Sequence, residues 1–129
     1  MSKKLKSQKG FTLVEVMISM VILAIGVLGL APMMVTAMYG NAFSKDVTSA
    51  AFLAQDSMER LKNQSVITPI PFAQTDNGLF NVYNRSIRVD DSGSDVSVPP
   101  NVFRIQVTMS WTDKKGVSRS ETYSTYKMK

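Results

Sequence analysis

The 129-residue sequence contains neither cysteine nor histidine. The lack of cysteine excludes disulfide bonds and thiol nucleophiles, and it leaves the redox compartment of the protein undefined. The lack of histidine removes the usual side-chain base near neutral pH and the commonest zinc ligand. The remaining residues offer no candidate catalytic site. We therefore expect a protein that is not an enzyme and that needs no metal or other cofactor.

Charge is also missing from a long stretch of the chain. The 29 residues between Glu15 and Lys45 carry no formal charge. A helix of about 20 apolar residues is enough to cross a bilayer. A secretory signal peptide has a shorter apolar region, followed by its cleavage site. The sequence therefore predicts a membrane-spanning helix, with its hydrophobic part over residues 11–38.

The formal net charge of +5 arises mostly at the N-terminus. Four of the 15 basic residues precede Phe11, so the rest of the chain holds 11 basic against 10 acidic residues. Lysine-rich flanks mark the cytoplasmic side of a membrane helix. We expect a single-pass protein with a cytoplasmic N-terminus. The near-neutral remainder does not support a general electrostatic attraction to nucleic acid.

Glu15 is the one carboxylate at the start of this apolar stretch. A carboxylate at bilayer depth costs roughly 2.5–3.5 kcal/mol even on lenient insertion scales. A simple membrane anchor would explain the length of the stretch, but it would not explain why an acidic residue is kept there. The residue therefore predicts a functional role and a cationic partner.

The helical pattern continues beyond the uncharged stretch. Gly26, Gly29 and Pro32 interrupt it, and a proline removes a backbone donor, so a kink or a local melt is expected there. Apolar residues then recur at steps of three and four, which predicts an amphipathic half over residues 39–64. These residues are Phe43, Val47, Ala50, Ala54, Met58 and Leu61. The sequence predicts one helix from about Phe11 to about Asn63.

Residues 65–129 have the pattern of a small sheet. Prolines after Thr68 end the helix, and residues 74–78 are expected to form a turn. Alternation is clearest over residues 103–112, where every second side chain from Phe103 to Trp111 is apolar. Three strands are predicted, at 79–89, 103–112 and 117–126. The fold class is α+β, with a small antiparallel sheet packed on the C-terminal half of a long helix.

The N-terminal residues Lys9-Gly10-Phe11-Thr12-Leu13-Val14-Glu15 resemble the signal of type IV prepilins. The resemblance implies that residues 1–10 are a leader, that a prepilin peptidase cuts between Gly10 and Phe11, and that Phe11 becomes N-methylated. It also implies that Glu15 pairs with the terminal amine of a neighbouring subunit during filament assembly.

The stretch from Glu15 to Ala31 resembles minor pilins of the PilV type, and Pro32 matches the helix-breaking proline of the family. The absence of the C-terminal cysteine pair of many major pilins also fits a minor subunit. The resemblance implies location in the bacterial inner membrane and then in an extracellular filament. The implied partners are major and minor pilins, the inner-membrane assembly platform, and membrane lipid before assembly. A pseudopilin of a type II secretion system shares these features, and a DNA-uptake pilin is a weaker alternative.

Two other clusters, one of acidic and one of basic residues, are candidate binding sites. Asp90, Asp91 and Asp95 could hold calcium, but their spacing differs from that of an EF-hand, which favours a solvated turn. A basic group near one predicted hairpin could contact DNA, but without interleaved aromatic residues a solvated sheet face is favoured. The basic group comprises Arg104, Lys114, Lys115 and Arg119.

Overall fold

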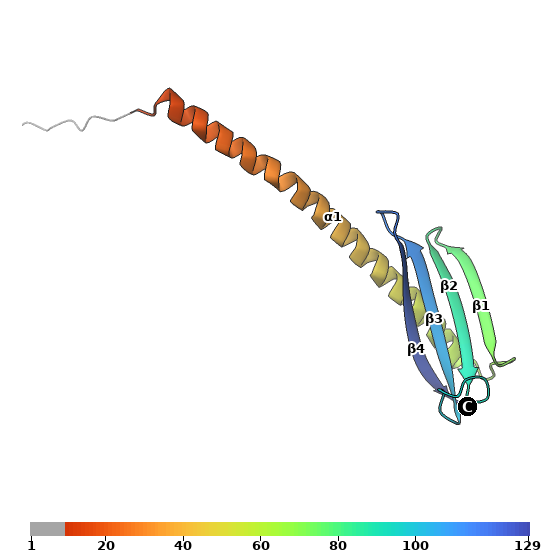
Figure 1. Cartoon of the computed structure of the whole chain (residues 1–129). Coiled ribbons are helices and arrows are strands. Elements are labelled where there is room, and N and C mark those ends of the chain that lie inside the picture. The colour runs from red at the N-terminus through yellow and green to blue at the C-terminus, as the bar shows by residue number, and fades with distance from the viewer. Residues whose placement is uncertain (1–9) are drawn as a thin grey trace, which may run out of the picture. The chain divides into compact units, whose positions relative to one another are not determined.

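The computed structural model describes residues 10–129, so the predicted leader lies outside the described residues except for Gly10. One helix, α1 (Leu13–Asn63), precedes four strands (Figure 1). The strands are β1 (Phe72–Leu79), β2 (Tyr83–Asp91), β3 (Val102–Thr112) and β4 (Ser118–Met128). The α+β fold class is confirmed. The chain divides into a first unit that ends at Met38 and a second unit, Tyr39–Lys129.

The described part of the first unit is the N-terminal half of α1 with the three residues before it. All of its residues are exposed, and an 18-residue window in the helix has a mean hydropathy of 2.6 with none of its residues buried. The helix passes through Pro32 without interruption, so the predicted local melt is wrong. The proline deprives one carbonyl of its donor, and the hydrogen bonds on either side still hold the helix. A kink at Gly26, Gly29 and Pro32 stays a prediction.

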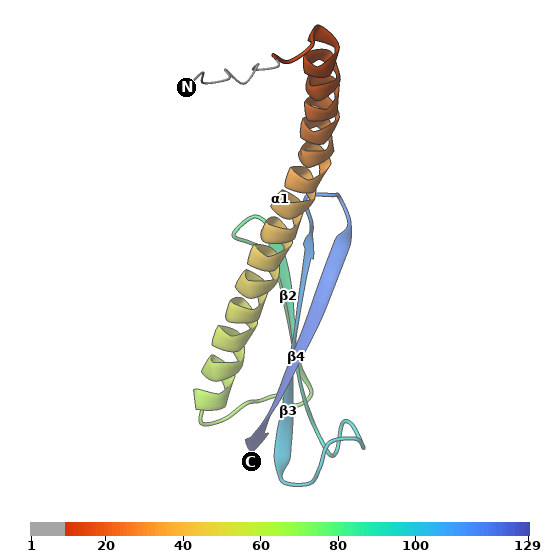
Figure 2. The same ribbon diagram turned by 90° about the vertical axis from the view of Figure 1, so that its left-hand side faces the viewer.

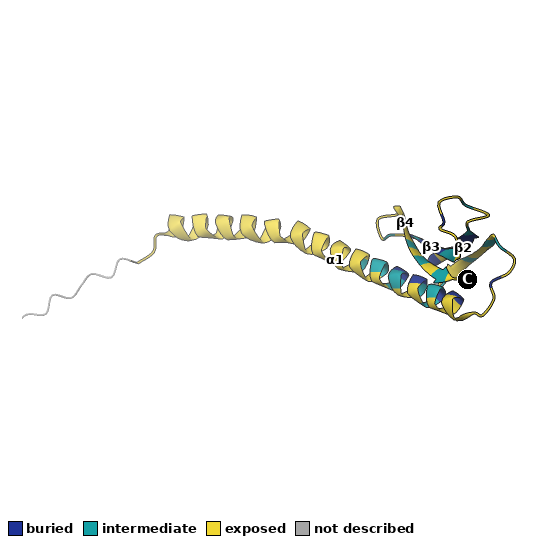
Figure 3. Ribbon diagram, turned by 90° about the horizontal axis from the view of Figure 1, so that it is seen from below, coloured by how far each residue is buried: buried dark blue, intermediate teal, exposed yellow. Residues whose placement is uncertain are grey.

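The second unit packs a four-stranded antiparallel sheet, ordered β1-β2-β3-β4, against the C-terminal half of α1 (Figure 2). The buried helix residues Ala50, Ala54 and Leu61 lie within the predicted apolar stripe. Two alanines on this face let the helix backbone approach the sheet closely. Figure 3 shows burial appearing on this half of the helix. The sheet contributes Ile87, Val89, Ile105, Val107, Met109 and Trp111 to the same core.

Strand β3 has the alternation that the sequence predicts. Ile105, Val107 and Met109 are fully buried, and the residues between them are partly exposed. Strand β4 pairs antiparallel with β3, with Val107 opposite Tyr123. The predicted hairpin between these two strands is therefore confirmed.

The first hairpin differs from the prediction. Residues 74–78, expected to form a turn, belong to strand β1, so the sheet has four strands rather than three. The turn lies at Phe80 and Asn81, whose φ angles are 52° and 59°. Strand β1 is at the edge of the sheet, where a strand needs no alternating apolar face. Its Asp76 accepts a hydrogen bond from Arg85 Nε of β2 at 3.0 Å.

The C-terminal end of the chain ties the second unit together. Lys127 donates to the carbonyl oxygen of Leu61 at 3.4 Å and also to that of Gln64. Leu61 lies in the last turn of α1 and Gln64 directly follows the helix, so both contacts place the lysine cation at the negative end of the helix dipole. Lys129 forms an ion pair with Asp91 at 2.9 Å. The last strand thereby stabilises both the end of the helix and the loop that follows β2.

Candidate functional site at the start of the long helix

The candidate cleavage site lies on an uncovered stretch of chain. Gly10 and Phe11 precede α1, and both are exposed, Phe11 to 83 %. A Cβ atom built on Gly10 meets no described atom within 4 Å. The peptide bond between these residues is therefore free of steric cover from the described chain.

Thr12 caps the helix. Its Oγ1 accepts a hydrogen bond from the backbone N–H of Glu15 at 3.3 Å, and its carbonyl oxygen accepts one from Val16 at 3.2 Å. A threonine with a glutamate three residues later has the spacing of a capping box. This role was not predicted from the sequence, although the Thr-x-x-Glu spacing is its signal.

Phe11 and Val16 line the same shallow hollow at the start of the helix. They stand at the two positions that form a hydrophobic staple, one residue before the cap and four residues after it. The staple and the cap together define the direction in which the chain enters the helix. They place Phe11, the predicted new terminus, at the first turn of the helix that also contains Glu15.

Glu15 lies in the first turn of α1 and is exposed. Among the residues that the structure describes, no hydrogen bond or ion pair reaches its carboxylate. The nearby Ser19 hydroxyl donates to the backbone oxygen of Glu15 at 2.8 Å instead. The positive end of the helix dipole favours an anion at this position, but it does not replace a counter-charge. Glu15 is therefore an available anion in an apolar setting.

Two hydroxyl side chains in the apolar half of α1 donate hydrogen bonds to backbone carbonyl oxygens of the same helix. Thr36 donates to the carbonyl oxygen of Pro32 at 2.9 Å, as Ser19 does to that of Glu15. Such hydrogen bonds provide each hydroxyl group with an acceptor, which it would otherwise lack in an apolar environment. Glu15 remains the single formal charge between residues 13 and 38.

The predicted residues fall into two groups along this helix. Gly10, Phe11 and Glu15 lie together at its start, whereas the predicted kink residues begin about three turns further on, at Gly26. A Cβ atom built on Gly26 or Gly29 meets no described atom within 4 Å. The two glycines therefore serve no close packing inside the described chain, and small residues of this kind allow another helix to approach.

The acidic group at the end of β2 and in the loop after it is paired with protein cations. Asp90 is fully buried, so the prediction of a solvated turn is wrong for this residue. Its carboxylate accepts from Arg88 Nε at 2.7 Å and from Arg104 at 3.5 Å. Burial of a carboxylate requires such cationic partners. Asp95 also pairs with Arg104.

The third carboxylate of the group, Asp91, is neutralised by Lys129. All three carboxylates of the acidic group therefore have a protein cation. Within residues 10–129, no group of three or more acidic side chains is placed to hold a metal ion. This arrangement is a network of ion pairs that organises the loop.

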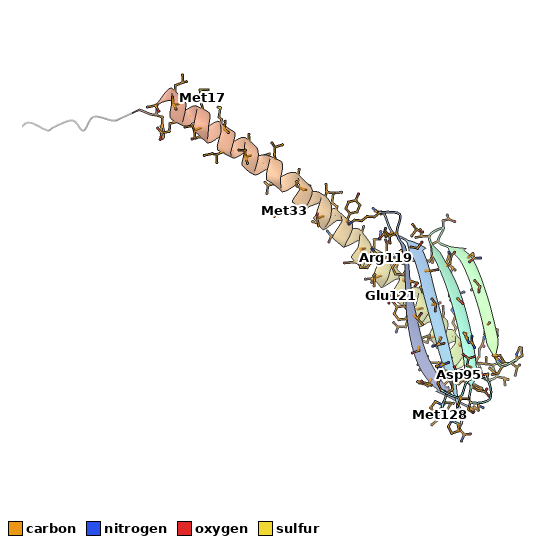
Figure 4. The ribbon with its side chains drawn as sticks, in the orientation of Figure 1. Met17, Met33, Asp95, Arg119, Glu121 and Met128 are labelled. Atoms are coloured by element: carbon orange, nitrogen blue, oxygen red, sulfur yellow. The ribbon has the colours of Figure 1, made fainter. Side chains whose placement is uncertain are left out.

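The basic group expected at one hairpin is also divided. Arg104 belongs to the network just described, and Figure 4 shows its partner Asp95 at the opposite end of the sheet from Arg119. Arg119 pairs with Asp113 at 3.1 Å. Only Lys114 and Lys115 remain together at the hairpin, which is too small a patch to track a nucleic-acid backbone.

Comparison with known proteins finds a family model that matches the N-terminal part of the chain. Residues 5–31 match the model of the prokaryotic N-terminal methylation motif. The matched range includes Gly10, Phe11 and Glu15. No curated protein and no solved structure matches the chain.

Proposed function

We propose that the chain, whose residues 5–31 carry the prokaryotic N-terminal methylation motif, is a type IV pilin-like protein that serves as a minor pilin of a type IV pilus. It is made as a prepilin, cut between Gly10 and Phe11, and methylated at the new terminus. Its helix holds it in the inner membrane until it enters the filament. The absence of cysteine and the resemblance of Glu15–Ala31 to PilV-type pilins support a minor subunit.

The observation that carries this proposal is the carboxylate of Glu15, which has no partner among residues 10–129, at the start of an exposed apolar helix. Cleavage after Gly10 creates a cationic amine on Phe11, which is the complementary group. Two unit charges at 4 Å attract with about 1 kcal/mol in water and about 4 kcal/mol at the effective dielectric constant near a protein surface. A pair formed between subunits places each new helix at a fixed height beside its neighbour.

The exposed apolar half of α1 suits both environments of such a subunit, the membrane and the filament core. Lipid covers it before assembly, and the helices of neighbouring pilins cover it in the filament core. The partners in this scheme are a prepilin peptidase, the inner-membrane assembly platform, and major and minor pilins. The sheet of the second unit then lies outside the core.

The Glu15→Ala variant tests the role of the carboxylate. We expect the variant to be inserted and cut normally but to enter filaments poorly, because removing one partner of a buried pair typically costs 3–5 kcal/mol. The amount in sheared pilus fractions, relative to the membrane pool, measures incorporation. Val14→Ala is the matched control, since it changes a neighbouring residue without changing charge. Normal incorporation of Glu15→Ala contradicts the proposed role.

A deletion strain decides which machine contains the subunit. A minor pilin predicts loss of twitching motility or of surface pili. A pseudopilin of a type II secretion system, which has the same leader and glutamate, predicts instead that secreted enzymes accumulate inside the cell.

A further inference from the structure

Two lysines at the tip of the β3–β4 hairpin have no acidic partner among the described residues. Lys114 and Lys115 are both exposed. In the described part of the chain, neither has a carboxylate within ion-pair distance, whereas the neighbouring Arg119 pairs with Asp113 at 3.1 Å. The Asp113 carboxylate also accepts the backbone N–H groups of Lys115 at 2.8 Å and Val117 at 3.0 Å. Asp113 therefore organises the turn, and the tip presents two uncompensated positive charges.

The same hairpin is held against two aromatic residues of α1. Lys115 Nζ lies 5.0 Å from the centre of the Tyr39 ring, and the Arg119 guanidinium carbon lies 5.5 Å from that of Phe43. Both distances are within the range of cation–π attraction. Tyr39 and Phe43 are four residues apart and therefore lie on one face of the helix. The two contacts fix the hairpin tip beside this turn of α1.

This turn of the helix is also where the uncharged stretch ends. Of the 29 uncharged residues between Glu15 and Lys45, about 20 suffice for the hydrocarbon core, so the last of them reach the headgroup layer. Tyrosine is enriched at that level, because its ring is apolar and its hydroxyl is polar. Tyr39 has this position in the sequence, and Lys115 lies over its ring.

We propose that the tip of the β3–β4 hairpin is a contact surface for anionic phospholipid headgroups, with Lys114 and Lys115 binding lipid phosphate groups while the subunit is in the membrane. The inference rests on the proposed membrane-anchored pilin and adds a second contact to its helix. Each lysine close to an anionic surface shifts the docked population by about fivefold. The contact is lost when the helix leaves the bilayer, so it orients the sheet before assembly and disappears in the filament.

The absence of cysteine allows a direct test with the full chain in lipid nanodiscs. A Ser118→Cys substitution places a fluorophore beside the hairpin tip, and Val96→Cys places one on an exposed residue in the loop after β2. A quencher attached to lipid headgroups reports the proximity of each label. The comparison uses discs of phosphatidylcholine alone and discs that also contain phosphatidylglycerol.

We expect strong quenching at position 118 in anionic discs and weak quenching in neutral ones. The double variant Lys114→Gln and Lys115→Gln abolishes the difference. The matched control, Arg60→Gln with Lys62→Gln, removes two exposed charges of α1 and leaves the difference unchanged. Position 96 shows little quenching in every sample.

Equal quenching at position 118 in both lipids, or equal loss in the two double variants, overturns the inference. The proposed function fails separately, because it is measured by cleavage at Gly10–Phe11 and by incorporation of Glu15→Ala into filaments. A chain that is inserted and cut normally but shows no lipid-dependent quenching therefore contradicts only the hairpin contact.

Discussion

Thr12 and Glu15 perform separate tasks at the start of α1. The hydroxyl oxygen of Thr12 satisfies the backbone N–H of Glu15 at 3.3 Å. Within the described chain, the Glu15 carboxylate does not return the second hydrogen bond of a capping box, to the backbone N–H of Thr12, so it stays available for another partner. The cost of an acid at membrane depth predicted the importance of Glu15 from the sequence.

The Thr12→Ala variant removes the capping oxygen and leaves the charge pattern unchanged. Loss of such a cap costs about 1 kcal/mol. We expect the backbone amide of Glu15 to exchange its hydrogen about fivefold faster, measured by nuclear magnetic resonance on the full chain in micelles. Thr12→Ser retains the oxygen and serves as the control. Equal exchange in Thr12→Ala and the unaltered chain contradicts the capping role.

The strands differ in how clearly the sequence predicts them. Strand β3 lies inside the sheet with one face in the core, so its apolar residues alternate and its position was predicted. Strand β1 lies at the edge and is held partly by the ion pair between Asp76 and Arg85. Its polar residues look like a turn in the sequence. Their strand conformation follows from pairing with β2, which no local pattern reveals.

The loop after β2 is organised by charge in a protein without disulfide bonds. Hydrogen bonding to Lys129 lowers the pKa of Asp91 to about 2. Hydrogen bonds from Ser97, and then from Arg104, lower the pKa of Asp95 to about 2. Asp91 also accepts the backbone N–H of Gly93 at 3.1 Å. The two carboxylates therefore connect the loop to β3 and to the C-terminus.

These pKa values predict that the loop opens in acid. Both lie below the ordinary value of about 3.9, so the ionised carboxylates contribute their full stabilisation above that pH. The contribution is lost as the pH falls toward 2. We expect faster hydrogen exchange at the Gly93 amide, relative to amides of β3, over that interval. The Lys129→Gln variant shifts the Asp91 part of the transition upward in pH, and an unshifted transition argues against the ion pair.

The two units differ in what stabilises them. Every buried residue of the described chain belongs to the unit Tyr39–Lys129, and the first unit buries none. The first unit therefore depends on its surroundings, either lipid or neighbouring subunits. The second has a closed core between α1 and the sheet.

This difference predicts that a fragment of residues 39–129 folds without the apolar half of the helix. We expect a soluble monomer with one cooperative thermal transition, followed by the fluorescence of Trp111, which is 3 % exposed. Met109→Ala in the same fragment lowers the free energy of unfolding by about 2–5 kcal/mol, because it leaves a cavity. A fragment that aggregates or melts without cooperativity shows that the second unit needs the first.

The sequence by itself determined the membrane-compatible helix, its boundary near Asn63, the lone carboxylate of Glu15 at the start of that helix and the strand around Met109. Each of these features leaves a local or periodic pattern in the sequence. The pattern arises because the side chains on one face of a helix or strand share one environment and therefore one polarity. Only the tertiary structure determined that β1 forms an edge strand, that Asp90 is buried with its two arginines, and that Lys115 lies over the ring of Tyr39. These features join residues far apart in the chain, and their energies come from pairing, desolvation and charge, which no local pattern records.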